Sequence, residues 1–200
     1  SIRRRMTILW QTALIRQARP RIEDEIEVGL RYYHLSLLRE IPALNRAVHD
    51  TLTSRFDVRF RDGGGSAIVR PGSWIGGDHD GNPFVTADTL DYASRRAAQT
   101  VLKYYSGELH ALEHELSLSD RMTSVTVELV ELAVRGRNDV PSRVDEPYRQ
   151  AIHGIRGRIL ATTAALIGED AVEGVWHREH QPYASAAEFD ADLRIVDEAL

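Results

Sequence analysis

Hydrophobic residues recur at three- and four-residue spacing over most of the chain, which is the period of one face of an α-helix. The pattern predicts one group of helices over residues 2–53 and a second group over residues 86–199. Pro20 ends the first helix, and Pro42 kinks the second or begins another. Thr86 and the capping box Ser185-Ala186-Ala187-Glu188 predict the starts of two later helices. The fold class that follows is mainly α, with long helices.

The pattern changes between these two groups, over residues 57–85. Val58, Phe60 and Ala67-Ile68-Val69 are short stretches of extended character, separated by a glycine-rich turn. From residue 72 to residue 83 the chain combines glycine with aspartate, histidine and asparagine, a composition that neither a helix nor a core strand explains. We therefore expect one short strand region that leads into a glycine loop over residues 57–85. We treat the whole chain, residues 1–200, as a single segment.

Composition excludes several classes of protein. The 200 residues include no cysteine, which excludes a disulfide framework and thiolate metal sites and fits a cytoplasmic protein. No apolar run approaches the roughly 20 residues of a membrane-spanning helix, so we expect no membrane partner. The net charge of −5 argues against a nucleic-acid partner.

Because the chain begins at Ser1 inside a helical pattern and ends at Leu200 without a stop signal, we expect an internal fragment of a longer protein.

The basic residues are nearly all arginine, and Lys103 is the only lysine. A GC-rich coding bias explains the bulk of them, because they stand beside acidic residues on helical faces. The alternative explanation is recognition of phosphate or carboxylate groups, which the planar guanidinium suits.

The glycine loop has the residues of an anion site. At Gly76-Gly77 no Cβ intervenes, so backbone amides can approach a ligand closely, and a run of such amides binds anions. Asp78 and Asp80 could accept hydrogen bonds from arginines or bind a hard cation, and Asn82-Pro83 ends the loop. The alternative is a tight turn whose aspartates cap neighbouring amides.

The string Gly72-Ser73-Trp74-Ile75-Gly76-Gly77-Asp78-His79-Asp80-Gly81-Asn82-Pro83 closely resembles the active-site loop of phosphoenolpyruvate carboxylases. Segments on both sides are similar to the same family in the expected order, among them Arg16-Gln17-Ala18-Arg19-Pro20 and Glu146-Pro147-Tyr148-Arg149. The resemblance spans nearly the whole chain and covers about a fifth to a quarter of a family chain.

This resemblance implies a cytoplasmic carbon–carbon lyase that needs Mg²⁺ or Mn²⁺. In this family bicarbonate attacks the phosphate of phosphoenolpyruvate, and carboxylation of the resulting enolate gives oxaloacetate for the tricarboxylic acid cycle. The implied fold is a helix-rich (β/α) barrel, of which this chain is a segment, in a homotetrameric parent. The family's His-Pro-Thr-Glu motif, its metal ligands and its second basic loop match nothing here. We therefore expect the isolated chain to be inactive and to hold no metal.

The resemblance assigns substrate binding to the loop and to one tryptophan, namely Gly76, Gly77, Asp78, His79, Asp80, Asn82 and Trp10. At the position of His79 the family usually carries arginine, associated with the substrate phosphate. Histidine has fewer donors than arginine and is only partly charged near neutral pH. This departure therefore calls into question whether residue 79 binds the substrate phosphate. Trp10 corresponds to a tryptophan near the methylene group of the substrate, although a core aromatic on an amphipathic helix explains it equally well.

Two metal-site hypotheses compete with this interpretation. His110-Ala111-Leu112-Glu113-His114 fits the H-x-x-E-H pattern of zinc metallopeptidases, with its glutamate as general base and Glu188 or Asp190 as a third ligand. Asp78-x-Asp80-x-Asn82 resembles the start of a calcium loop, but Thr89 stands where the closing glutamate belongs. Both patterns are short, and the carboxylase interpretation is preferred.

A further alternative is a noncatalytic helical interaction module, whose exposed apolar faces would self-associate. A size-exclusion profile that changes with concentration would indicate this behaviour. His177 and His180, near Trp176, are expected to be surface residues rather than metal ligands.

Overall fold

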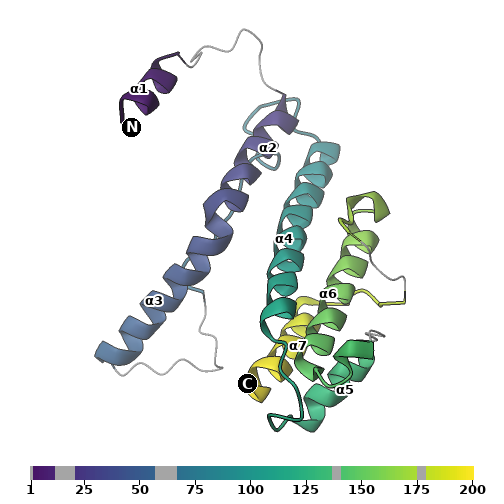
Figure 1. The fold of residues 1–200 in the computed structure, drawn as a ribbon. Helices are drawn as coiled ribbons and strands as arrows, with labels where there is room; N and C mark the ends of the chain where they lie inside the picture. Colours follow the sequence, from purple (N-terminus) through teal and green to yellow (C-terminus); the bar gives the residue numbers. More distant parts are fainter. Residues whose placement is uncertain (1, 12–20, 57–66, 137–140, 175–178) are drawn as a thin grey trace.

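The computed structural model describes residues 2–11, 21–56, 67–136, 141–174 and 179–200. The α-helices in these ranges (Figure 1) are α1 Ile2–Gln11, α2 Ile22–Tyr32, α3 Leu38–Phe56, α4 Ala87–Glu115, α5 Val127–Arg135, α6 Pro147–Leu166 and α7 Ala186–Ala199. A π-helical turn, Tyr33–Leu37, joins α2 to α3, and short 3-10 turns lie at Pro141–Arg143 and Glu169–Ala171. The prediction of a mainly α fold is confirmed.

The strand expected at residues 67–69 is not formed, because these residues lie in an extended segment without a strand partner in the described part of the chain. The side chain of Asn45 in α3 takes the place of a neighbouring strand. Its Nδ2 donates to the carbonyl oxygen of Val69 (3.0 Å), and the amide of Val69 donates to its Oδ1 (2.9 Å). One side chain thus satisfies both backbone groups of Val69. The stretch expected at Val58 and Phe60 lies outside the described residues.

α2, the π-helical turn and α3 follow one another as a single long rod, and α4 lies beside the first part of this rod (Figure 1). The first turn of α2 contains Glu23, Asp24 and Glu25, which stabilise the positive end of the helix dipole. Asp24 in this turn also accepts a hydrogen bond from the amide of Arg21 (3.1 Å). Pro42, which has no amide hydrogen to donate, lies inside α3 shortly after the π-helical turn. It therefore does not separate two helices.

α4 links the two parts of the molecule. Its 29 residues begin at the expected cap, where Thr86 Oγ1 accepts from the amide of Thr89 (3.4 Å) and Thr89 Oγ1 accepts from the amide of Thr86 (3.3 Å). Near its start it packs against α2, and near its end Leu109 enters the core formed with α6. The helix runs through Gly107 without a break, so it reaches from the glycine loop to the core.

The hydrophobic core lies in the C-terminal bundle, which we define as α5, α6, α7 and the second half of α4. Its buried members are Leu109, Leu129, Leu132, Ala133, Tyr148, Ala151, Ile152, Ile155, Ile159 and Val196. α6 is at the centre, since twelve of its twenty residues are buried. α5 and α6 approach so closely that a side chain on Gly154 would overlap the backbone of Gly136. Glycine at these two positions therefore permits the packing of the bundle.

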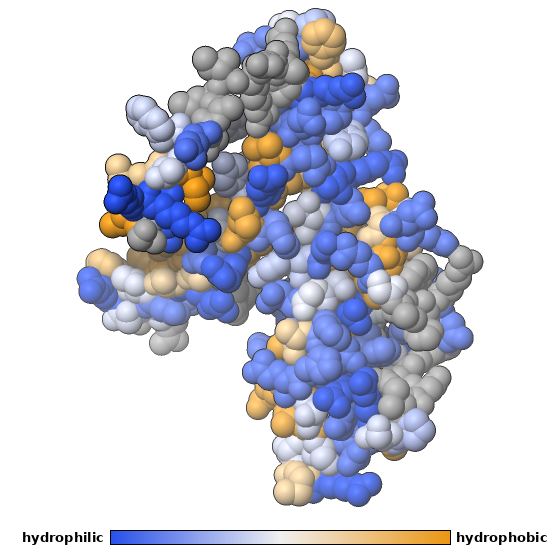
Figure 2. Space-filling model, turned by 45° about the horizontal axis from the view of Figure 1, so that its top comes forward, coloured by the Kyte–Doolittle hydropathy of each residue, from blue (hydrophilic) through white to orange (hydrophobic). Residues whose placement is uncertain are grey.

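Hydrophobic side chains are also exposed on both parts of the molecule, and Figure 2 shows patches of them within a mostly hydrophilic surface. Tyr32 and Leu35 are exposed on the rod, and Val127 and Val134 are exposed on α5. Patches of this kind are typical of surfaces that contact other protein. Within the described ranges, no helix has both the length and the apolar character needed to cross a bilayer.

Candidate functional site

The glycine loop, residues 72–83, packs against both α2 and α4 where these helices lie side by side. We call this line of contact the seam. Gly76 lies deepest in this seam and has a φ angle of +84°, a conformation that favours glycine. A Cβ at Gly76 would lie 2.8 Å from Cβ of Ala93 and 2.9 Å from Cδ1 of Ile26. Gly29 of α2 makes room for the next side chain, since its Cβ would lie 2.9 Å from Cδ1 of Ile75. Both the backbone angle and the close approach therefore require glycine at position 76.

Backbone hydrogen bonds shape the loop into consecutive tight turns. The amides of Gly77 and Asp78 both donate to the carbonyl oxygen of Trp74 (3.0 Å each), and the amide of Asn82 donates to the carbonyl oxygen of His79 (2.5 Å). The side chain of Asn82 accepts from the amide of Phe84 through Oδ1 (3.1 Å). Asn82 thus ends the loop as an Asx turn, as its position before proline predicts.

The outer part of the loop presents unused backbone donors. The amides of His79, Asp80 and Gly81 have no acceptor among the described residues. Asp80 (φ 25°) and Gly81 (φ 72°) have left-handed backbone angles. All three residues are exposed. Successive amides in such a turn are a known arrangement for binding anions.

The side chains of Asp78, His79 and Asp80 are exposed as well, and none of them forms a hydrogen bond or ion pair within the described part of the chain. The alternative of aspartates that cap neighbouring amides is therefore not what the structure shows for Asp78 and Asp80. Their carboxylates remain available for groups outside the described chain.

Several residues that sequence reasoning missed hold the loop in place. The hydroxyl of Tyr33 donates to the carbonyl oxygen of Gly72 (2.9 Å). Beside the loop, Glu27 of α2 receives hydrogen bonds from Arg96 of α4 through Nε (2.5 Å) and Nη2 (2.8 Å), and from Tyr92 (3.2 Å). The hydrogen bond from Arg96 lowers the pKa of the Glu27 carboxyl, although partial burial opposes this. We call these three residues, Glu27, Tyr92 and Arg96, the α2–α4 clasp.

A cavity of about 310 Å³ lies between α2, the loop and α4. Its walls are mostly apolar and include Ile26, Leu30, Tyr33, Ile75, Leu90 and Ala93. The polar groups of the loop thus lie next to an apolar recess, which is the usual construction of a small-molecule site.

Trp10 is not brought to this site. It lies on α1, is 91% exposed, and α1 stands apart from α2 and α4 (Figure 1). Its assignment to the substrate pocket therefore stays a prediction. The flanking residues 16–20 that support the family resemblance lie outside the described residues.

The H-x-x-E-H motif does not form a metal site. Glu113 is buried and pairs with Nη1 of Arg143 (2.9 Å) and Nδ1 of His153 (3.3 Å), while Nδ1 of His110 is 3.9 Å away. Burial alone would raise the pKa of Glu113, but the hydrogen bond from His153 and the positive charges of His153, Arg143 and Arg156 lower it to about 2. A carboxylate with so low a pKa is an ion-pair centre and a poor general base.

The other residues proposed as metal ligands are also engaged elsewhere. Glu188 pairs with Arg158, and Asp190 pairs with Arg194 (3.0 Å). No group of three or more histidine, aspartate or glutamate side chains is placed to hold a metal ion in the ranges that the structure describes. The zinc and calcium hypotheses therefore gain no support.

His180 is half-buried rather than on the open surface. Its ring lies over Gly157 of α6, so closely that a side chain at Gly157 would overlap it, and its centroid is 6.3 Å from that of His153. His180 is thus only partly exposed, because α6 offers a glycine gap that the ring fills, and its expected role as a surface residue rather than a metal ligand stays a prediction. Trp176 and His177 lie outside the described residues.

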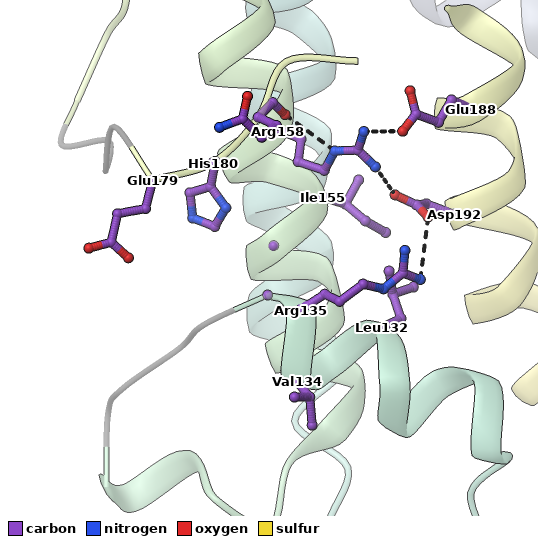
Figure 3. A pocket seen from close by; sticks show the side chains of 12 residues that line it. Leu132, Val134, Arg135, Ile155, Arg158, Glu179, His180, Glu188 and Asp192 are labelled. Atoms are coloured by element: carbon purple, nitrogen blue, oxygen red, sulfur yellow. Dashed lines mark hydrogen bonds and ion pairs between the residues drawn. The ribbon is translucent and has the colours of Figure 1, made fainter. Parts of the chain in front are cut away.

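A second and larger cavity, of about 550 Å³, lies where α5, α6 and α7 meet. Figure 3 shows Arg158 between Glu188 and Asp192, with Nη1 2.9 Å from Asp192. The guanidinium also lies 3.8 Å from the ring centroid of Tyr183. Because two carboxylates already neutralise Arg158, this cavity offers little to an anionic ligand.

Comparison with known proteins places the whole chain in one family. The family described as phosphoenolpyruvate carboxylase matches residues 1–200. The phosphoenolpyruvate carboxylase of Corynebacterium glutamicum is 68% identical over 202 residues, which cover 100% of this chain and 21% of that protein. Those of Nocardia farcinica and Ralstonia nicotianae are 47% and 44% identical, and also match over 100% of this chain. The chain spans about a fifth of the length of these relatives.

Proposed function

Because this chain belongs to the phosphoenolpyruvate carboxylase family, we propose that it forms part of an enzyme that joins bicarbonate to phosphoenolpyruvate. Bicarbonate attacks the phosphorus atom, and the bond between phosphorus and the enol oxygen breaks. The products of this step are carboxyphosphate and the enolate of pyruvate. Carboxylation of the enolate then gives oxaloacetate and inorganic phosphate. Such a reaction needs positive and hydrogen-bond-donating groups around phosphate and enolate oxygens.

Within that enzyme, the glycine loop forms one wall of the phosphate site. The observation that carries this proposal is the run of exposed amides at His79, Asp80 and Gly81, which have no acceptor in the described chain. These amides would donate to phosphate oxygens, and His79 would add a positive charge when protonated. Asp78 and Asp80 would accept from basic groups supplied by the rest of the parent protein.

The metal ion that the family implies would be bound by other parts of the parent. Asp78 and Asp80 are single exposed carboxylates, and the described chain has no cluster of three metal-binding side chains. Its residues therefore do not fit a Mg²⁺ or Mn²⁺ site by themselves. Accordingly, no step through the ion is assigned to this chain.

We further propose that the isolated chain lacks carboxylase activity, since it is about a fifth of its relatives' length and its sequence contains no His-Pro-Thr-Glu motif. The family resemblance supports a homotetrameric parent located in the cytoplasm.

The test uses the full-length parent carrying this sequence, with oxaloacetate formation followed by coupled reduction to malate in the presence of Mg²⁺. Replacing His79→Ala removes one charge-assisted hydrogen bond, so we expect KM for phosphoenolpyruvate to rise on the order of tenfold. The variant His79→Arg carries a permanent charge and a planar fork of donors, so it should lower KM below that of the unchanged enzyme.

His114→Ala is the matched control, because His114 is an exposed histidine at the far end of α4 and should leave KM unchanged. A parent that makes no oxaloacetate would show that the proposed reaction is wrong. If the parent is active but His79→Ala and His79→Arg behave like the unchanged enzyme, the reaction stands and the role of the loop does not.

A further inference from the structure

A third cavity, of about 220 Å³, lies in the C-terminal bundle, away from the glycine loop. It is bordered by α4, α6 and residues 171–173 at the end of the turn Glu169–Ala171. Polar side chains line it from both helices, and these are Gln99, Lys103, Ser106, His110, Arg156 and Thr163. The volume is too small for a nucleotide and suits a small anion or a short organic acid.

Arg156 is the residue that sets this cavity apart. Its Nε is buried and has no hydrogen-bond partner in the described chain. The neighbouring arginines of the bundle are well paired: Arg143 binds Glu113, and Arg149 binds Glu146 (2.7 Å) and the carbonyl oxygen of Glu113 (2.8 Å). Arg158 pairs with two carboxylates. A buried N–H group without an acceptor is costly, so an acceptor for Nε of Arg156 is expected.

The acidic groups near Arg156 are already occupied. Glu113 attracts Arg156 electrostatically, but its oxygens are bound by Arg143 and His153. Glu173 pairs with Nζ of Lys103 (2.5 Å) at the edge of the cavity, where both side chains are more than half exposed. Arg156 therefore has no ion-pair partner among the described residues.

The rest of the lining supplies neutral donors. Oε1 of Gln99 accepts from Arg96, which leaves the amide nitrogen of Gln99 as a donor. The hydroxyl of Ser106 forms no hydrogen bond within the described ranges. Thr163 donates its hydroxyl hydrogen to the carbonyl oxygen of Ile159 (2.9 Å), so it contributes shape rather than a donor.

We propose that this cavity binds a small oxyanion, a carboxylate or phosphate, whose oxygens accept hydrogen bonds from the Arg156 guanidinium and from Gln99 and Ser106. The planar fork of arginine matches the geometry of both kinds of oxyanion. The site is separate from the glycine loop, and the proposal does not depend on the reaction catalysed by the parent.

The experiment measures binding of inorganic phosphate and, in a second arm, acetate to the full-length parent by isothermal titration calorimetry at constant ionic strength. The unchanged protein should bind one more oxyanion per chain than Arg156→Gln, or bind it on the order of tenfold to a hundredfold more tightly at this site. The arm that saturates at the lower concentration identifies the class of oxyanion. Arg194→Gln, which removes an exposed arginine of α7, is the matched control and should bind like the unchanged protein.

A second variant keeps the test decisive if Arg156→Gln does not fold, as judged by circular dichroism. Ser106→Asp places a carboxylate in the cavity, where it would occupy the fork of Arg156, so it should also abolish the additional oxyanion. Equal binding by the unchanged protein and both variants would overturn the proposal. So would the absence of oxyanion binding in the unchanged parent, which would indicate that another part of the parent chain supplies the acceptor.

Discussion

The C-terminal bundle buries a continuous apolar core, whereas the rod and the glycine loop have few buried apolar residues. Twelve residues of α6 are buried, but none of α3. We call the described residues 21–86, which include α2, α3 and the glycine loop, the loop half. The buried hydrophobic residues described there are Ile26 and Val85. The loop instead depends on Gly76 in the seam, the hydroxyl of Tyr33 and the α2–α4 clasp. We therefore expect the bundle to be the more stable part of the chain and the loop half to be the less stable one.

The largest expected effect is the loss of a core side chain. Ile155 is fully buried at the centre of α6, so Ile155→Ala should reduce the free energy of unfolding by roughly 2–5 kcal/mol. Leu44→Ala on α3, where the side chain is 50% exposed, should change it by less than about 0.5 kcal/mol. Urea denaturation followed by circular dichroism measures both. Equal losses in the two variants would contradict the contrast between bundle and rod.

A smaller, pH-dependent effect is expected for the buried ion pair. Folding lowers the pKa of Glu113 from 4.5 to about 2. At pH values above 4.5 this shift adds about 3 kcal/mol to the free energy of unfolding. Because a lowered carboxyl pKa stabilises the charged form, this contribution is present at neutral pH and is lost as the pH falls from about 5 to 2. In Glu113→Gln the loss over this range should be smaller by that amount.

The measurement is the free energy of unfolding as a function of pH for both proteins. Glu40→Gln is the control, since Glu40 is an exposed glutamate paired with Arg39 and should keep the pH dependence of the unchanged chain. Parallel curves for the unchanged protein and Glu113→Gln would show that Glu113 does not carry the effect.

The smallest expected effect concerns the α2–α4 clasp. The side chains of Glu27 and Arg96 are 42% and 32% exposed, so solvent screens their attraction, and Glu27→Gln should cost less than about 1 kcal/mol. The effect should be local. Hydrogen exchange of the amides of Gly77 and Asp78 should become faster, while exchange in α6 stays the same. Uniformly faster exchange throughout the chain would mean that the two halves unfold as one unit.

Local patterns in the sequence predicted much of this architecture. Hydrophobic spacing predicted the helices, Thr86 and Ser185 were found as caps, and the family predicted from the glycine loop is confirmed. These features depend on neighbours within a few residues, which is why a pattern can identify them. Asn82 ends the loop as predicted. Gly76 and Gly77 were predicted to bring their amides close to a ligand, whereas Gly76 packs against Ile26 and Ala93 and the amide of Gly77 donates to Trp74.

The failures involve partners that are distant in the chain. The H-x-x-E-H spacing could not show that Glu113 faces Arg143 and His153, which lie 30 and 40 residues further along. The residues at 67–69 favour an extended backbone, but a strand also needs a partner, and α3 supplies a side chain instead. The unpartnered Nε of Arg156 is likewise visible only once α4 and α6 are packed together.

The contact between Asn45 and Val69 also has a consequence for the fate of the chain in solution. An exposed extended segment with free amides and carbonyls is a template onto which another molecule can add a strand, and such addition leads to aggregates. Asn45 occupies the donor and the acceptor of Val69 at once. The apolar stretch next to the glycine loop can thus stay extended without offering the backbone of Val69 to a second copy of the protein.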